Sequence, residues 1–188
     1  MHLVTTPNGP IGPFYHFALT DHATSVMAGP KAKGERIKLT VRVLDSAGVQ
    51  ATNAMIELWQ ADANGVYNNP ADPRHREADP DFTGFGRQAT DEEGLCSFDT
   101  VVPGSVPGPG GALQAPHINL TVYAPGLLRR ITSRIYFFGD AANASDFVLS
   151  LVPHERRSTL MAHEGAEPGE WNFDLHLAGD RETVFFDV

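Results

Sequence analysis

Short runs of alternating apolar and polar residues recur along the chain and predict β-strands, because a strand turns successive side chains to opposite faces. In residues 117–123, Ile118, Leu120 and Val122 alternate with polar side chains. Similar runs predict strands at 36–44, 55–60, 95–101, 133–138, 147–152, 171–177 and 183–188. Only residues 155–164 show a helical pattern, and it is short. About eight strands separated by turns predict an all-β fold, a single-domain β-sandwich with long loops and little helix.

Two long segments lack a strand pattern. Residues 1–35 are rich in proline and glycine and carry several aromatic side chains. We therefore expect an N-terminal arm over 1–35 that packs on its own domain or on a partner's, followed by the sandwich domain over 36–188. The polar residues 68–93 predict a long loop, and long loops in compact domains tend to be functional.

Composition narrows the classes of function. The chain has 14 Lys and Arg against 23 Asp and Glu, a net charge of -9, which opposes attraction to nucleic acid or to an anionic membrane. We find no secretory signal pattern and no long apolar run, so we expect a cytoplasmic location. The one cysteine, Cys96, cannot form an internal disulfide, and its place in a predicted strand indicates a small buried thiol.

His117 and Asn119 are separated by one residue on a predicted strand and therefore point to the same side. Two imidazoles at this spacing could bind one metal ion together. A carboxamide carries no charge and is a weak ligand for a transition metal, so Asn119 argues against such a site. The other histidines show no ligand-like spacing.

Several segments together carry a resemblance to a known family. The chain resembles the intradiol ring-cleaving dioxygenases over nearly its whole length, most specifically at 59–67, 84–87, 115–120, 134–137, 156–160 and 182–187. Within the family it is similar to the α subunits of members that act on protocatechuate and pair α with β subunits. The resemblance implies the β-sandwich fold and an oxidoreductase of aromatic catabolism, in the β-ketoadipate pathway.

The family holds ferric iron with two tyrosines and two histidines, and the resemblance places these four ligands on this chain. The first tyrosine matches Tyr67 and the first histidine matches His117, whereas the second of each falls at Val106 or a neighbour and at Asn119. Hard Fe(III) favours phenolate oxygen and accepts imidazole, so half of the ligand set is missing. Gln114 also stands where catalytic relatives carry an arginine. We therefore expect neither a metal nor catalytic residues in this chain alone.

The resemblance then implies a partner, a β subunit that keeps all four ligands and binds Fe(3+). The complex would cleave protocatechuate with O2 to 3-carboxy-cis,cis-muconate. In the family the α arm helps to wall the β chain's cleft, and Gly12, Pro13 and Arg134 match positions that line it. The arm departs from the family pattern at Asn8, Gly9 and Pro10.

Two other functions stay open on the sequence alone. One is a stand-alone intradiol catechol dioxygenase that completes its iron shell with atypical ligands. The other is a non-catalytic β-sandwich that binds ligands or proteins. The first requires iron in the isolated chain, and the second predicts no gain in dioxygenase activity when a β partner is added.

Overall fold

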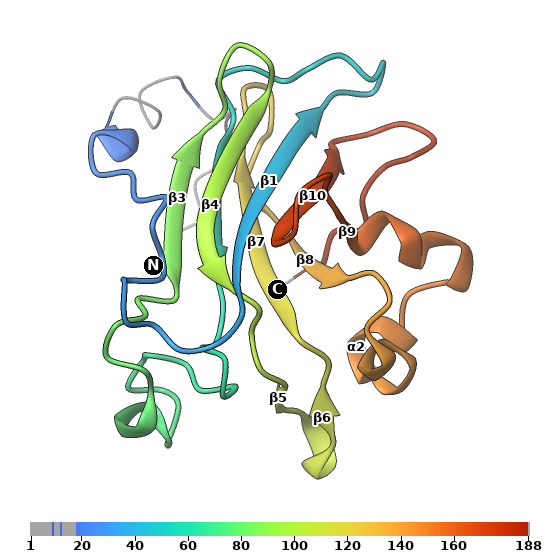
Figure 1. Ribbon diagram of the computed structural model, residues 1–188. Helices are drawn as coiled ribbons and strands as arrows, with labels where there is room; N and C mark the ends of the chain where they lie inside the picture. Colours follow the sequence, from blue (N-terminus) through green and yellow to red (C-terminus); the bar gives the residue numbers. More distant parts are fainter. Residues whose placement is uncertain (1–8, 10–11, 13–17, 188) are drawn as a thin grey trace, which may run out of the picture.

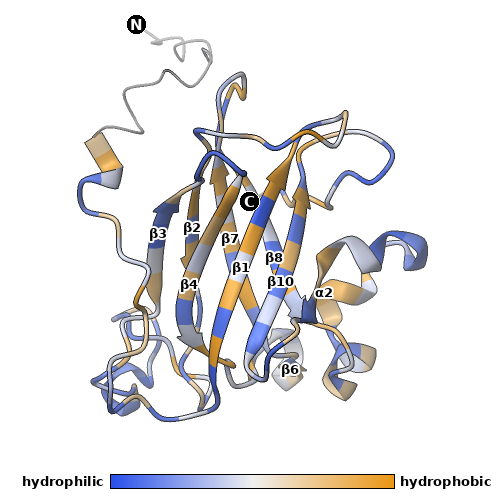
Figure 2. Cartoon of the chain, turned by 45° about the horizontal axis from the view of Figure 1, so that its top comes forward, coloured by the Kyte–Doolittle hydropathy of each residue, from blue (hydrophilic) through white to orange (hydrophobic). Residues whose placement is uncertain are grey.

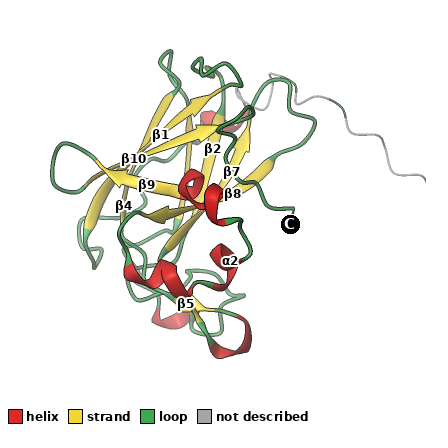
Figure 3. Ribbon diagram, turned by 90° about the vertical axis from the view of Figure 1, so that its right-hand side faces the viewer, coloured by secondary structure: helices red, strands yellow, loops and turns green. Residues whose placement is uncertain are grey.

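The computed structural model describes residues 9, 12 and 18–187. Its strands are β1 (Arg36–Leu44), β2 (Met55–Trp59), β3 (Phe85–Ala89), β4 (Leu95–Val101), β5 (Val106–Pro107), β6 (Leu113–Gln114), β7 (His117–Tyr123), β8 (Ile131–Phe137), β9 (Met161–Glu164) and β10 (Glu170–His176) (Figure 1). Its short helices are η1 (His75–Glu77), η2 (Pro109–Gly111), η3 (Ala141–Ser145), α2 (Phe147–Ser150) and η4 (His154–Leu160), and they lie outside the sheets (Figure 3). Over the described residues, no helix has the length and apolar character needed to span a bilayer.

One continuous sheet folds back on itself to make the two layers. It is 8-stranded, in the order β3-β2-β7-β8-β9-β10-β1-β4, and β5 and β6 form a separate hairpin. β9 pairs with β8 on one side and with β10 on the other, so the sheet bends there from the layer β3-β2-β7-β8 into the layer β10-β1-β4. The predicted all-β sandwich with little helix is confirmed.

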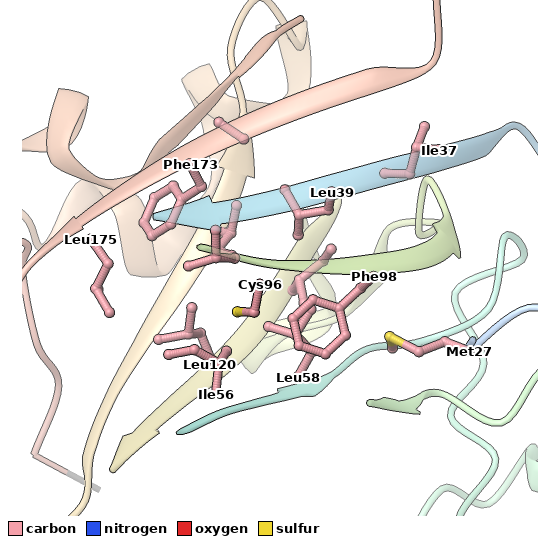
Figure 4. Packing of buried hydrophobic residues seen from close by; sticks show 14 of the residues in the cluster. Met27, Ile37, Leu39, Ile56, Leu58, Cys96, Phe98, Leu120, Phe173 and Leu175 are labelled. Atoms are coloured by element: carbon pink, nitrogen blue, oxygen red, sulfur yellow. The ribbon is translucent and has the colours of Figure 1, made fainter. Parts of the chain in front are cut away.

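The core lies between the two layers and follows from the alternation along the strands, which is visible on β1 in Figure 2. Side chains from β1, β2, β4, β7, β8 and β10 meet there in one cluster (Figure 4). Cys96 of β4 is only 6% exposed in this cluster, and burial raises the pKa of its thiol to about 12. The predicted buried thiol is therefore confirmed, and it is unsuited to nucleophilic chemistry.

Residues 24–29 close the gap between the two free edges of the sheet. Thr24 bridges to β3 and Val26 bridges to β4. Met27 lies between them and is fully buried. A Cβ atom on Gly86 of β3 would lie 2.8 Å from Met27 Sδ, so a glycine there makes room for the methionine. This part of the expected arm is a wall of the sandwich itself.

The strand predicted at 147–152 is wrong, because α2 occupies Phe147–Ser150. Asp146 caps this helix: its Oδ1 accepts a hydrogen bond from the Leu149 N–H at 2.7 Å. An aspartate directly before an apolar run is a helix-start signal, and it outweighed the apolar run that we interpreted as a strand.

The helix predicted at 155–164 is correct only in its first part. The 3-10 helix η4 ends at Leu160, and the residues that follow form β9. β9 has 4 residues, too few to show a clear alternation, although it is the strand that joins the two layers.

The strand predicted at 183–188 is also wrong over the described residues. This segment makes only an isolated bridge, from Phe186 to Thr132 of β8. Side-chain hydroxyls take over part of the pairing, since Thr132 Oγ1 donates to the Phe186 carbonyl and Ser133 Oγ donates to the Val184 carbonyl. The segment therefore lies along β8 without extending the sheet.

The predicted loop at 68–93 contains a strand, β3. Its sequence, FGRQA, has no run of alternating apolar residues that could have revealed it. β3 pairs with β2 over its full length and forms one edge of the sheet.

Candidate functional site

A cavity of about 570 Å³ lies on the side of β2, β7 and β8 that faces away from the core. The strand register sets its floor, because Trp59 of β2 pairs with Asn119 of β7, and Asn119 pairs with Arg134 of β8. Successive side chains alternate, so these three stand in a row on one face. The remaining walls come from residues of the 69–74 loop and from Tyr67, Val106, Pro107, Gln114 and His117.

A network of aspartate hydrogen bonds holds the loop that carries Tyr67. Asp62 is buried, and its Oδ1 accepts from the N–H groups of Asn64 and Val66 while its Oδ2 accepts from the Asp79 N–H. These bonds form the tight turn that the Asn-Gly pair predicts. Asp72 Oδ2 then accepts from the Tyr67 N–H at 3.1 Å. Asp72 thus fixes the position of Tyr67 through the backbone N–H of the tyrosine.

Tyr67 and Asn119 contact each other directly. The Asn119 Nδ2 atom lies 3.4 Å from the Tyr67 hydroxyl and 3.3 Å from the Trp59 carbonyl oxygen, and donates to both. Burial is the main reason that the pKa of Tyr67 is raised, although Asn119 and the positive charge of Arg134 act in the opposite direction. Tyr67 is therefore a neutral phenol at neutral pH.

His117 is a neutral imidazole in a defined tautomer. Its Nδ1 lies 2.7 Å from the Ala115 carbonyl oxygen, which can only accept, so Nδ1 carries the proton and Nε2 is a hydrogen-bond acceptor. The residue is 3% exposed. Burial, followed by the positive charge of Arg134, lowers its pKa from 6.5 to about 4.

The β5–β6 hairpin places apolar and amide groups where the family has ligands and an arginine. Val106 is buried, lines the cavity and has no oxygen or nitrogen donor in its side chain. Its strand partner is Gln114, whose Oε1 accepts from Arg134 Nη1 at 2.7 Å. Val106, which by the resemblance stands at or next to the position of the second tyrosine, is therefore an apolar part of the wall.

Arg134 adds a positive charge to the cavity wall. Besides Gln114, its Nη1 donates to the Tyr136 hydroxyl at 3.5 Å, which in turn donates to Asp146 Oδ1 at 3.1 Å. Burial raises the pKa of Tyr136 to about 12, so this link stays protonated. Asp146 is held in place by the Ala115 N–H, which donates to its Oδ2.

The structure brings together all four positions that the family resemblance assigned to iron ligands. Tyr67, Val106 and His117 line the cavity, and Asn119 contacts Tyr67. Arg134, which we expected to line a partner's site, faces this chain's own cavity. Sequence reasoning did not single out Trp59, Asp72 or Asp146, and the length of the 68–93 loop was the one signal that pointed to part of this wall.

Of the two arm residues in our list, the structure describes only Gly12. Gly12 is exposed, and a Cβ atom built on it would meet nothing within 4 Å. Pro13 lies outside the described residues.

The cavity does not fit a four-ligand ferric site. Its family positions offer one phenol and one imidazole, Tyr67 and His117, beside an amide and an isopropyl group. Across the part of the chain that the structure describes, no group of three or more His, Cys, Asp or Glu side chains is placed to hold a metal ion. The cavity instead presents a guanidinium, a phenol and a neutral imidazole to a ligand.

Comparison with known proteins places the chain among dioxygenases. A family model described as "Dioxygenase" matches residues 9–179. The chain is 39% identical to the protocatechuate 3,4-dioxygenase alpha chain of Burkholderia cepacia, over 99% of this chain and 98% of that protein. It is 32% identical to the protocatechuate 3,4-dioxygenase beta chain of the same organism, over 92% of this chain and 75% of that protein.

A solved structure supports the fold independently. The dioxygenase domain of a dioxygenase and carbohydrate-binding fusion protein from Streptomyces sp. SirexAA-E superposes with a TM-score of 0.63 at 25% identity. The match covers 86% of this chain and 89% of that one.

Acid should destabilise the fold through His117. Its folded pKa of about 4 lies below the ordinary value of 6.5, so the unfolded chain binds the proton more tightly. The contribution to stability is complete above about pH 6.5 and is lost as the pH falls toward 4, by up to about 3 kcal/mol. Urea unfolding at pH 7.5 and pH 4.5 should therefore show a smaller pH effect for His117→Asn, which keeps a donor for the Ala115 carbonyl. Equal losses in the two proteins would refute this assignment.

Restoring the two missing donors should create a ferric site. The double variant Val106→Tyr with Asn119→His adds a phenol and an imidazole next to Tyr67 and His117. We expect it to bind about one Fe(III) per chain and to show visible phenolate-to-iron absorption, measured by metal analysis and spectroscopy. The matched control, Val106→Phe with Asn119→His, has the same bulk but only the phenol of Tyr67, so it should bind less Fe(III) and absorb more weakly. A folded double variant that binds no iron would show that the four positions no longer converge.

Proposed function

The chain belongs to the intradiol dioxygenase family, and on that premise we propose that it is the α subunit of a protocatechuate 3,4-dioxygenase. It has no complete iron site of its own and works with an iron-bearing β subunit. The complex cleaves the ring of 3,4-dihydroxybenzoate between the two hydroxylated carbons, and both atoms of O2 enter the product, 3-carboxy-cis,cis-muconate. We include a cytoplasmic location in this proposal; the unpaired, buried Cys96 is compatible with it.

One observation carries the proposal. The fold brings the four family ligand positions to one cavity, yet only Tyr67 and His117 are ligand types, and Asn119 uses its amide to bond the Tyr67 hydroxyl. A chain with the family scaffold and half of the donors fits a supporting subunit better than a separate catalyst. The identity to an alpha chain along nearly the whole length supports the same role.

The partner would bring what this chain lacks. Relatives of this chain include a beta chain as well as alpha chains, which supports a complex of two related subunits. We propose that the β subunit binds Fe(3+), and that the substrate reacts there with O2. Iron would supply the oxidising centre that makes the catechol ring reactive toward O2. This chain would wall and orient that site from the neighbouring subunit.

Three residues are our candidates for the contact with the partner's site: Gly12, Pro13 and Arg134. A glycine allows close backbone approach to a ligand, and a proline stiffens the segment that makes it. Arg134 is a cation in a chain of net charge -9, so it would offset the repulsion of a carboxylated substrate.

Co-expression with a β-type chain that has all four ligands tests the proposal. We expect a complex with about one iron per αβ pair and oxygen uptake on protocatechuate, with the isolated α chain free of both. Size-exclusion chromatography with metal analysis and an oxygen electrode measures these quantities. Iron and full activity in the isolated α chain would instead support the stand-alone enzyme. An unchanged activity of the β chain with and without α would support the non-catalytic module.

Within that complex, Arg134→Ala should raise KM for protocatechuate. A lost charge-assisted hydrogen bond is worth about 1.5–3 kcal/mol, which corresponds to roughly a 10-fold to 100-fold change. Catechol has no carboxylate, so its KM should barely change. Arg129→Ala is the matched control, because Arg129 pairs with Asp187 at an exposed site outside the cavity. An unchanged KM for protocatechuate would remove Arg134 from the partner's site.

A further inference from the structure

The guanidinium of Arg134 has no counter-charge in contact with it among the described residues. Its two hydrogen-bond partners, Gln114 Oε1 and the Tyr136 hydroxyl, are both neutral. Asp146 is one bond further away and is occupied by the Tyr136 hydroxyl and by backbone N–H groups. Five of the ten other arginines form ion pairs, namely Arg42, Arg74, Arg87, Arg129 and Arg156.

The guanidinium of Arg134 lies in the wall of a cleft that is open to solvent. Arg134 is half-buried and lines the cavity of about 570 Å³. A partly desolvated cation without a partner is unfavourable, and an anion that enters the cavity would relieve this. The floor of the cavity therefore selects for negative charge, in a protein whose overall charge of -9 is repulsive to anions.

Flat apolar surfaces stand beside the guanidinium. The rings of Trp59 and Tyr67 stack at 5.8 Å with an interplanar angle of 15°. Val106, Pro73 and Pro107 add further apolar surface. A cavity of this size and lining suits one aromatic ring, because ring faces and apolar walls exclude water together.

The cavity also has an acceptor for a ring hydroxyl. The Nδ1–H of His117 donates to the Ala115 carbonyl, so Nε2 carries a lone pair. The nearby charge of Arg134 disfavours protonation of this imidazole. A phenolic hydroxyl of a ligand could donate to Nε2 while the carboxylate of the same ligand reached Arg134.

From this arrangement we infer that the chain's own cavity binds a hydroxylated aromatic carboxylate without any metal. Arg134 pairs with the carboxylate, the stacked Trp59 and Tyr67 wall contacts the ring, and His117 accepts from the hydroxyl. This site is separate from the one proposed in the partner, and the inference rests on the cavity's contacts rather than on ring cleavage. Both roles use the guanidinium of Arg134, so the experiment must measure them apart.

The test is calorimetric titration of the full, iron-free chain with 4-hydroxybenzoate. We expect binding at one site per chain. Benzoate, which lacks the hydroxyl, should bind more weakly, and phenol and cyclohexanecarboxylate should bind at least tenfold more weakly, because each lacks the carboxylate or the flat ring. No heat of binding at millimolar 4-hydroxybenzoate, or equal affinity for phenol, would overturn the inference.

Variants then assign the site. Arg134→Gln should weaken 4-hydroxybenzoate at least tenfold and leave phenol binding unchanged, whereas Arg134→Lys, which keeps the charge, should recover part of the affinity. Val106→Phe fills the cavity without changing its charge and should also abolish binding. Arg129→Ala should bind like the wild type. Full affinity in a folded Arg134→Gln or Val106→Phe chain would place the ligand elsewhere and overturn the inference.

The assembled complex separates this site from the proposed function. Titration of the αβ pair should show two sites, of which only one changes the visible spectrum of iron. If the complex cleaves the ring normally but the iron-free site does not bind 4-hydroxybenzoate, the inference is overturned and the proposed function stands. Iron-free binding in a chain that never supports ring cleavage would leave the inference standing and refute the proposed function.

Discussion

On β7, the buried side chains Ile118, Leu120 and Val122 anchor the strand between β2 and β8, and this anchoring assigns His117 and Asn119 to the opposite face. A slip of one residue would turn the apolar side chains out of the core, so the register is strongly specified. The same register places Trp59 and Arg134 on either side of Asn119. The cavity is therefore a consequence of core packing, and its chemistry depends on which residues occupy its fixed positions.

Two of the four positions that the resemblance assigns to iron ligands carry poor metal ligands here. A carboxamide at 119 and an isopropyl group at 106 remove two donors, and the remaining phenol and imidazole are both neutral. Arg134 presents a positive charge to the cavity beside these two neutral groups. Such a cavity favours an anion over a cation. The same floor could thus serve iron in one family member and a carboxylate in another through changes at a few side chains.

Sequence reasoning succeeded where one physical rule controlled the outcome. The alternation in 117–123 gave both the strand and the shared direction of His117 and Asn119, and the layered all-β fold followed from similar runs. It failed where local hydrogen bonds decided which secondary structure forms. The Asp146 side chain caps a helix at Phe147–Ser150 where we expected a strand. β9 forms because it pairs on both sides, although its 4 residues have no pattern of their own. The lining by Trp59 could not be predicted, since it depends on the register between strands.

Three carboxylates hold the loops of the cavity in place through hydrogen bonds. Asp62, Asp72 and Asp146 each accept at least two hydrogen bonds, mostly from backbone N–H groups. Burial alone would raise the pKa of Asp72, but the N–H groups of Arg74 and Tyr67 lower it overall, so the carboxylate stays charged and keeps its bonds. In a site organised by an ion, removing ligands would also loosen the loops. Here the loops depend on aspartates outside the ligand positions, so a substitution at a ligand position leaves the hydrogen bonds of these aspartates in place.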